Sequence, residues 1–289
     1  MKKAYIKLHI SIILAGFTGI FGKLITLNEG LISWYRLFFS SIIMLLLFAA
    51  RGRFPNSSNA DKLKIGFTGT LLGLHWLFFY GSIKYSNISV GVVCYALTSF
   101  FNAILAPMIN KNKFSYQELL LSSLTLCGIG LIFGMDATYR TGIILGVISS
   151  VFSALYTVYS ERVARQYESA TVMLYQMIGG CIGLSVFMPI FFLITPVSTI
   201  IPSSADFWWL LVLSALCTVV MYFLITDALK SIPSFTVSLS FNLEPLYTIL
   251  LAIVIYKEGR ELSVAFYIGL LLIVSSLAFQ MYRLNYAKK

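Results

Sequence analysis

Long apolar runs separated by short polar breaks make up nearly the whole chain. A helix needs about 20 apolar residues to cross the hydrocarbon core of a membrane. Runs of that length predict ten membrane-spanning helices, at 8–27, 31–50, 64–83, 88–110, 116–135, 141–160, 170–194, 207–228, 235–256 and 263–283. The remaining residues suffice only for short connections, so we expect no soluble domain beside the helices.

The composition supports this interpretation. Of the 289 residues, 58% are hydrophobic and only 11% are charged, whereas soluble domains are about 45–50% apolar and about 25% charged. This excludes a soluble enzyme, a nucleic-acid-binding module and a disordered chain. Each of the four cysteines lies inside an apolar run without metal-ligand spacing, so we predict buried free thiols at Cys94, Cys127, Cys181 and Cys217.

The distribution of basic residues orients the predicted helices. If the N-terminus lies inside, 15 of the 21 Lys and Arg residues fall in inner segments and only four in outer ones. Such a bias marks the cytoplasmic side of a membrane protein. We therefore predict a multi-pass protein of the bacterial inner membrane, with both termini in the cytoplasm. The net charge of +10 then reflects orientation, and no nucleic-acid partner is expected.

An internal similarity divides the chain into two halves. Residues 17–21 (Phe-Thr-Gly-Ile-Phe) match 152–156 (Phe-Ser-Ala-Leu-Tyr) at an offset of 135 residues. We place the halves at 1–138 and 139–289, with five predicted spans in each. An odd number of spans forces the second half into the membrane upside down, and such inverted repeats occur in many secondary transporters. The expected fold is an all-α integral membrane protein of ten transmembrane helices in two inverted five-helix repeats.

Several motifs are similar to those of one transporter family. They are Trp-Tyr-Arg-Leu-Phe at 34–38, Leu-Glu-Pro-Leu-Tyr at 243–247, Tyr-Lys-Glu at 256–258, and Gly269. With the ten spans, they resemble the drug/metabolite transporter superfamily in its EamA branch. The resemblance covers essentially the whole chain and implies a ten-helix inverted-repeat carrier of small metabolites, often an exporter.

The chain departs from this family pattern at a few positions. The segment 110–113 (Asn-Lys-Asn-Lys) stands where the family usually has a glutamate, and Ser99 lies near a usual proline. Lys257 and Arg260 add charge to the last outer loop. These departures leave the fold unaffected but prevent transfer of a substrate from better-known relatives.

Glu244 is the most unusual residue of the predicted spans, because it lies near the middle of the ninth. An ionisable group at this depth costs about 2.5–3.5 kcal/mol and normally faces the bundle interior or a wet cavity. Ser240, Tyr247 and Thr248 share its helix face, and Pro245 breaks the backbone hydrogen bonding beside it. Glu244 is predicted either to bind an amine-bearing substrate or carry a proton, or to fix the kink by accepting hydrogen bonds.

Other spans carry polar stripes at helical spacing. Such stripes either line a substrate cavity or hold helices together. The candidate substrate-binding residues, besides Glu244, are Tyr95, Ser99, Asn102, His75, Trp76, Tyr80, Tyr156, Tyr222 and Tyr247. Aromatic and amide side chains around one carboxylate suit a small polar or amphipathic solute, including one of amino-acid type.

His75 and Arg36 each allow two interpretations. His75 is expected at the depth of Glu244, so the two could respond to protons together; alternatively, a neutral His75 bonds to a backbone carbonyl. Arg36 either snorkels to the membrane surface or attracts an anionic substrate. Glycine pairs such as Gly69 with Gly73 and Gly179 with Gly183 predict close helix contacts.

The sequence favours a secondary transporter working by alternating access, an exporter by resemblance. It has no phosphate-binding Gly-Lys-Ser/Thr loop, and its two histidines lie on different spans. We therefore expect no enzyme activity, no cofactor and no metal. The expected partners are a small-molecule substrate and lipid, with protons as candidate coupling ions; the oligomeric state stays open. The alternative is a non-transporting membrane subunit or a flippase for a lipid intermediate.

Overall fold

The computed structural model describes residues 2–133, 139–195, 197, 199–256 and 264–286, and every regular element in these ranges is helical. In chain order they are α1 (Lys2–Leu24), α2 (Glu29–Ala50), α3 (Asn59–Lys84), α4 (Ile88–Tyr95), α5 (Thr98–Asn110), α6 (Tyr116–Phe133), α7 (Arg140–Ala164), α8 (Ser169–Ile194), α9 (Ser204–Ser214), a π-helix (Ala215–Val220), α10 (Met221–Leu229), α11 (Ser234–Ser240), a 3₁₀ turn (Phe241–Leu243), α12 (Glu244–Tyr256) and α13 (Val264–Tyr286).

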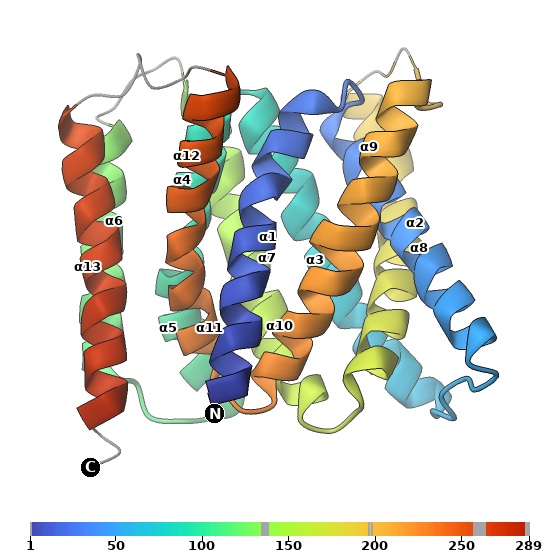
Figure 1. Cartoon of the computed structure of the whole chain (residues 1–289), viewed down its shortest axis with the longest axis horizontal. Helices are drawn as coiled ribbons and strands as arrows, with labels where there is room; N and C mark the ends of the chain where they lie inside the picture. The colour runs from blue at the N-terminus through green and yellow to red at the C-terminus, as the bar shows by residue number, and fades with distance from the viewer. Residues whose placement is uncertain (1, 134–138, 196, 198, 257–263, 287–289) are drawn as a thin grey trace.

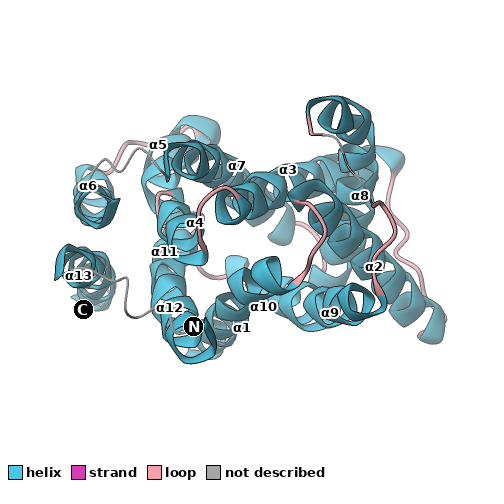
Figure 2. Cartoon of the chain, turned by 90° about the horizontal axis from the view of Figure 1, so that it is seen from above, coloured by secondary structure: helices cyan, strands magenta, loops and turns pink. Residues whose placement is uncertain are grey.

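The helices run side by side along one common direction, and α1 begins at the same end of the bundle at which α13 ends (Figure 1). Contacts between the predicted halves hold the bundle together. Helix α3 packs along both α7 and α8, and α6 packs along α13. Seen from above, α6 and α13 form an outer pair beside the remaining helices (Figure 2).

Helix is present in each predicted span, as far as the described residues reach. Among those residues, six helical segments are long and apolar enough to cross a membrane: Lys2–Leu24, Glu29–Ala50, Ile88–Asn110, Arg140–Ala164, Ser169–Ile194 and Ser204–Leu229. The charged segment 257–261 and the boundary at 138 lie outside the described residues.

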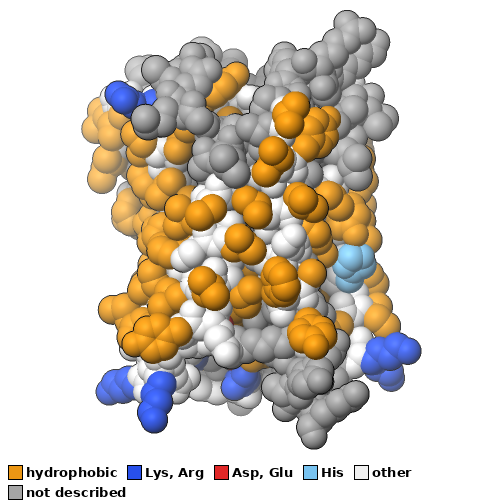
Figure 3. Space-filling view, turned by 90° about the vertical axis from the view of Figure 1, so that its left-hand side faces the viewer, with side chains coloured by type: hydrophobic (Ala, Val, Ile, Leu, Met, Phe, Trp, Pro, Cys, Tyr) orange, Lys and Arg blue, Asp and Glu red, His pale blue; other side chains and the backbone are white. Residues whose placement is uncertain are grey.

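The bundle turns apolar side chains outward and many polar ones inward. Leu46 and Leu193 are exposed, whereas Ser40 and Thr68 are buried. On the face drawn in Figure 3, hydrophobic side chains cover the middle and Lys and Arg lie toward the ends. Such a surface suits lipid, which cannot satisfy polar groups.

All four cysteines are free, as predicted, but they are not all buried. Cys94 and Cys217 are buried, Cys181 is half-buried, and Cys127 is exposed on α6. The prediction for Cys127 is wrong because an apolar thiol also suits the outer face of a helix surrounded by lipid.

Three of the predicted spans are not continuous α-helices. The ninth changes to a 3₁₀ turn at Phe241–Leu243, directly before the expected break at Pro245. The fourth is interrupted at residues 96–97, and the eighth widens to a π-helix at Ala215–Val220. These two irregularities were not predicted from the apolar pattern.

Glycines allow α3 and α8 to touch backbone to backbone, as their spacing predicts. A Cβ atom on Gly69 would lie 1.8 Å from the carbonyl oxygen of Gln176, and one on Gly179 would lie 2.2 Å from the Cα of Gly66. Neither position has room for a side chain. The contact therefore fixes the distance between these two helices.

Polar contacts join the helices at both ends of the bundle. At the end where α1 begins, Lys7 pairs with Asp227 at 2.5 Å, and the Tyr167 hydroxyl donates to Asp61, which lowers the pKa of the Asp61 carboxyl. At the opposite end, the amide and hydroxyl of Thr26 donate to Asp206 at 2.8 and 2.6 Å. Both ends are thus closed by specific contacts.

We expect Gly69→Ala to destabilise the protein by about 1–3 kcal/mol or more, because overpacking forces apart two helices in backbone contact. Gly81→Ala is the matched control, since its Cβ would meet only side-chain atoms, of Leu145 at 3.3 Å and of Glu29 at 3.7 Å. Thermal unfolding in detergent measures both variants. Equal midpoints would contradict the packing described for α3 and α8.

Candidate functional site

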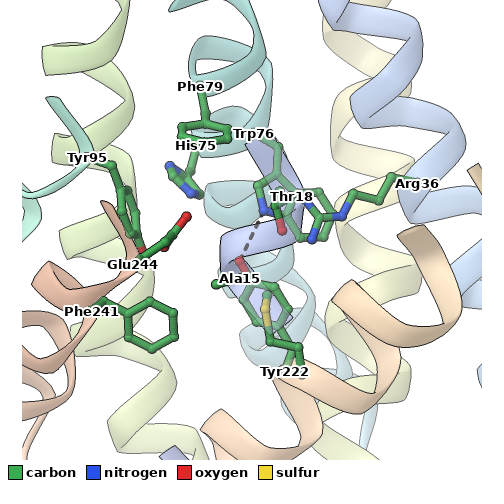
Figure 4. A pocket seen from close by; sticks show the side chains of 11 residues that line it. Ala15, Thr18, Arg36, His75, Trp76, Phe79, Tyr95, Tyr222, Phe241 and Glu244 are labelled. Atoms are coloured by element: carbon green, nitrogen blue, oxygen red, sulfur yellow. Dashed lines mark hydrogen bonds between the residues drawn. The ribbon is translucent and has the colours of Figure 1, made fainter. Parts of the chain in front are cut away.

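A narrow cavity lies at the centre of the bundle, between α1, α2, α3, α4, the start of α10, the 3₁₀ turn and the start of α12. About 20 Å³ is open to the centre of a water molecule, room for a single water. The lining residues are Ala15, Thr18, Arg36, His75, Trp76, Phe79, Tyr95, Met221, Tyr222, Phe241 and Glu244 (Figure 4). A second cavity shares Tyr95, Tyr222 and Phe241 and is also lined by Ser153, Tyr156, Thr157, Ile225, Val237 and Ser238.

The breaks in the helices lie beside this cavity. Tyr95 is the last residue of α4, and Glu244 is the first residue of α12, after the 3₁₀ turn. Tyr222 is the second residue after the π-helix. Irregular backbone in a membrane protein is tolerated where it lines a cavity, and the breaks here bring these three side chains to the same space.

Glu244 is buried, 4% exposed, and its carboxylate faces the cavity (Figure 4). Within the described residues no Lys or Arg forms an ion pair with it, and no side chain or backbone group donates a hydrogen bond to it. A carboxylate without a partner in a membrane interior is costly. Glu244 is therefore available to a cation or to a proton.

Arg36 lies on the opposite side of the cavity from Glu244 (Figure 4). It is completely buried, so the snorkelling interpretation is wrong. Its Nε donates to Thr218 Oγ1 at 2.7 Å, its Nη2 to the Cys217 carbonyl oxygen at 2.6 Å, and its Nη1 to the Tyr80 hydroxyl at 3.0 Å. The guanidinium carbon also stands 3.7 Å from the centre of the Trp76 ring, a cation–π contact.

The π-helix supplies two of these acceptors. In a π-helix the backbone bonds run to the fifth residue along, and such turns are common at functional sites. Cys217 and Thr218 both lie within it, and the Thr218 hydroxyl donates to the Leu213 carbonyl five residues back. The Cys217 carbonyl within this turn accepts a hydrogen bond from the guanidinium.

His75 is held by Ser149 of α7. Its Nδ1 lies 2.8 Å from Ser149 Oγ and 3.2 Å from the Ser149 carbonyl oxygen, while Ser149 Oγ donates to the His75 carbonyl at 3.0 Å. Because the hydroxyl proton is used in that bond, both Ser149 groups facing Nδ1 act as acceptors, and Nδ1 carries the hydrogen. With its hydrogen on Nδ1, a neutral His75 ring presents Nε2 as an acceptor.

Aromatic rings form the rest of the wall. Trp76 Nε1 donates to the Tyr222 hydroxyl at 3.1 Å, and the Tyr222 ring meets Trp76 and Tyr156 edge to face at 5.5 and 5.8 Å between centres. The Tyr156 hydroxyl is buried without a hydrogen-bond partner. This hydroxyl is a second polar group available to a ligand.

The predicted site residues do not all come together. Glu244, His75, Trp76, Tyr95 and Tyr222 line the central cavity, and Tyr156 lines the second. Tyr80 is not among the residues that line the two cavities; its hydroxyl accepts a hydrogen bond from Arg36.

Three other predicted residues lie away from both cavities: Ser99 and Asn102 on α5, which follows the break at residues 96–97, and Tyr247 on α12. Asn102 donates to Ser238 at 3.1 Å and Ser99 accepts from Asn242 at 3.4 Å. Tyr247 faces α1 and lies 3.1 Å from His9.

Arg36 lines the cavity but is not among the substrate-binding residues predicted from the sequence. Its place in the Trp-Tyr-Arg-Leu-Phe motif at 34–38 indicates a role in the site, whereas its place near the outer end of the predicted span is also typical of a side chain at the membrane surface. Only the fold shows that residues from α3 and from the π-helix surround it.

Comparison with known proteins identifies the family. Residues 2–134 and 140–282 each match the EamA-like transporter family.

The chain belongs to the EamA-like transporter family.

It is 27% identical to an uncharacterized transporter of Haemophilus influenzae over 86% of this chain and 84% of that one. It is 29% identical to the uncharacterized transporter YdfC of Bacillus subtilis, over 63% of this chain and 60% of YdfC. GDP-fucose transporter 1 of Dictyostelium discoideum is 23% identical over 84% of this chain and 69% of that protein.

A solved structure, described only as "Crystal structure of protein", has a TM-score of 0.69 and 18% identity over 96% of each chain. This likeness supports the fold alone. The EamA match confirms the resemblance found in the sequence and makes the chain a multi-pass membrane protein that transports a small solute.

We expect Thr218→Val to destabilise the protein by about 1–3 kcal/mol, because it leaves one N–H of the buried Arg36 without an acceptor. Thr226→Val is the control: the Thr226 hydroxyl is buried without a partner, so its removal should be neutral or stabilising. Thermal unfolding in detergent compares the two. Equal effects would show that Arg36 does not depend on Thr218.

Proposed function

We propose that this EamA-like transporter is a secondary exporter of a small polar or amphipathic metabolite, of amino-acid type or similar. It works by alternating access, with ten transmembrane helices arranged as two inverted halves, 1–138 and 139–289. It lies in the bacterial inner membrane with both termini in the cytoplasm. The unpartnered carboxylate of Glu244, facing a central cavity in the bundle, is the observation that carries this proposal.

The binding site in this proposal is the central cavity together with the second one. Glu244 accepts the cationic or hydrogen-bonding end of the solute, and His75 accepts a further hydrogen bond through Nε2. Trp76, Tyr95, Tyr156 and Tyr222 enclose it with aromatic faces and hydroxyl groups. We assign Ser99, Asn102 and Tyr247 to helix contacts and Tyr80 to the support of Arg36, in keeping with their hydrogen bonds.

Transport requires the cavity to open to one side at a time. The contacts at the α1 end, including Lys7 with Asp227, and those at the opposite end, including Thr26 with Asp206, are candidates for the two gates. Because the cavity holds about one water, its aromatic side chains must also move when solute enters. Proton coupling fits this scheme if Glu244 takes up a proton when the solute leaves.

A nucleotide sugar, the substrate in the printed name of GDP-fucose transporter 1, suits this cavity poorly. A diphosphate needs several cationic donors, whereas this cavity offers Arg36 and sets the Glu244 carboxylate opposite it. The charges favour a solute with little net charge.

The first test is flux from proteoliposomes loaded with a pooled panel of amino acids, nucleosides, sugars and amphipathic cations, with and without a pH gradient. We expect selective loss of one solute class and its abolition by Glu244→Gln, with folding unchanged. Glu168→Gln is the control, because Glu168 is exposed and lies between α7 and α8. Undiminished flux in Glu244→Gln would overturn the role of Glu244; no flux from any folded preparation would favour the subunit or flippase alternative.

Cysteine labelling tests the proposed topology. We expect Lys111→Cys, after α5, to react with a membrane-impermeant maleimide from the cytoplasmic side, and Tyr85→Cys, before α4, from the outside. Both positions are exposed, and the unsubstituted chain controls for its own cysteines. The reverse pattern would invert the proposed orientation.

A further inference from the structure

The central cavity holds two oppositely charged side chains that are not paired with each other. Arg36 and Glu244 both line it, from opposite sides (Figure 4), and no ion pair joins them. Both are buried, 0% and 4% exposed. Charges in a membrane interior normally pair with one another, so their separation across a cavity requires a reason.

The guanidinium retains donors for an anion. It has five N–H groups in a planar fork, and three of them donate to Thr218, Cys217 and Tyr80. These acceptors are neutral, so within the described part of the chain the positive charge has no anionic partner. Two N–H groups remain, the number that a carboxylate accepts in a bidentate pair.

The opposite side of the cavity offers acceptors instead. Glu244 presents a carboxylate, and His75, whose Nδ1–H is used by Ser149, presents Nε2 as an acceptor. Tyr95, which also lines this side, stacks obliquely near His75 at 5.2 Å between ring centres. An ammonium group, with three N–H donors and a positive charge, matches these groups.

We propose that the cavity takes a zwitterion, a solute with an anionic and a cationic group on neighbouring atoms, bound with its anion at Arg36 and its cation at Glu244 and His75. The inference rests on the proposed transport function and specifies its substrate class. A zwitterion supplies both buried charges with a counter-charge while adding no net charge to the membrane interior. A simple cation would leave Arg36 unpaired, and a simple anion would leave Glu244 unpaired.

The test uses charge-altered forms of one solute. Each proteinogenic amino acid with an uncharged side chain is offered to the unmodified transporter in proteoliposomes, and the fastest is compared with its N-acetyl form, which is anionic, and its carboxamide, which is cationic. We expect the zwitterion to move at least tenfold faster than either form. Comparable flux of one altered form, or flux of other solutes but of no amino acid, would overturn the inference and leave the transport function standing. Absence of flux for every solute tested would instead overturn the transport function.

Binding to purified variants gives an independent measurement, because Glu244→Gln is expected to abolish flux. By titration calorimetry, Glu244→Gln should bind the zwitterion at least tenfold more weakly and the anionic N-acetyl form more tightly, because no unpaired carboxylate then opposes it. Tyr247→Phe, on the same helix but outside the cavity, should retain both affinities. Equal loss of both ligands by Glu244→Gln, with the unfolding midpoint unchanged, would contradict the assigned polarity of the site.

Discussion

Arg36 carries a positive charge into the centre of the bundle, where its side chain has no contact with solvent. A buried guanidinium is tolerable only when oxygen atoms surround it. Here those oxygens come from Tyr80 on α3 and from two consecutive residues of the π-helix, so the charge binds three separate helical segments together. The Trp76 ring that covers it also donates to Tyr222, and the cavity wall thus depends on where this charge is held.

The second constraint is the backbone itself. A membrane interior offers no water to an interrupted helix, so breaks are confined to protein-lined space. In this chain the breaks fall at residues 96–97 and at Phe241–Leu243, in the fourth predicted span of each half, and each is flanked by a cavity residue, Tyr95 or Glu244. Paired interruptions of this kind are a recognised indication of a transporter binding site.

The apolar pattern predicted the helical segments well, because the thickness of the bilayer fixes their length. It also identified Glu244, since a carboxylate in an apolar run is costly and so conspicuous. Ser99, Asn102 and Tyr247 lie outside both cavities, which helical spacing does not indicate because it assumes an unbroken helix, whereas the break before α5 and the contact with α1 redirect them. Arg36 kept two interpretations in the sequence, because burial of an arginine depends on acceptors 181 and 182 residues away in the chain, which no local pattern reports.

The π-helix at Ala215–Val220 has a consequence for how this site is encoded. Each residue added to an α-helix turns everything after it by about 100°, since a turn takes 3.6 residues. A π-helix absorbs one additional residue in a single wide turn, so α9 and α10 keep their mutual orientation and Tyr222 faces the cavity. Deleting one residue from this stretch would return it to a regular α-helix and remove the wide turn in which Cys217 and Thr218 accept from the guanidinium. The number of residues in this one turn is therefore a determinant of the site. A sequence alignment of relatives that removes a one-residue gap here would match the wrong side chains.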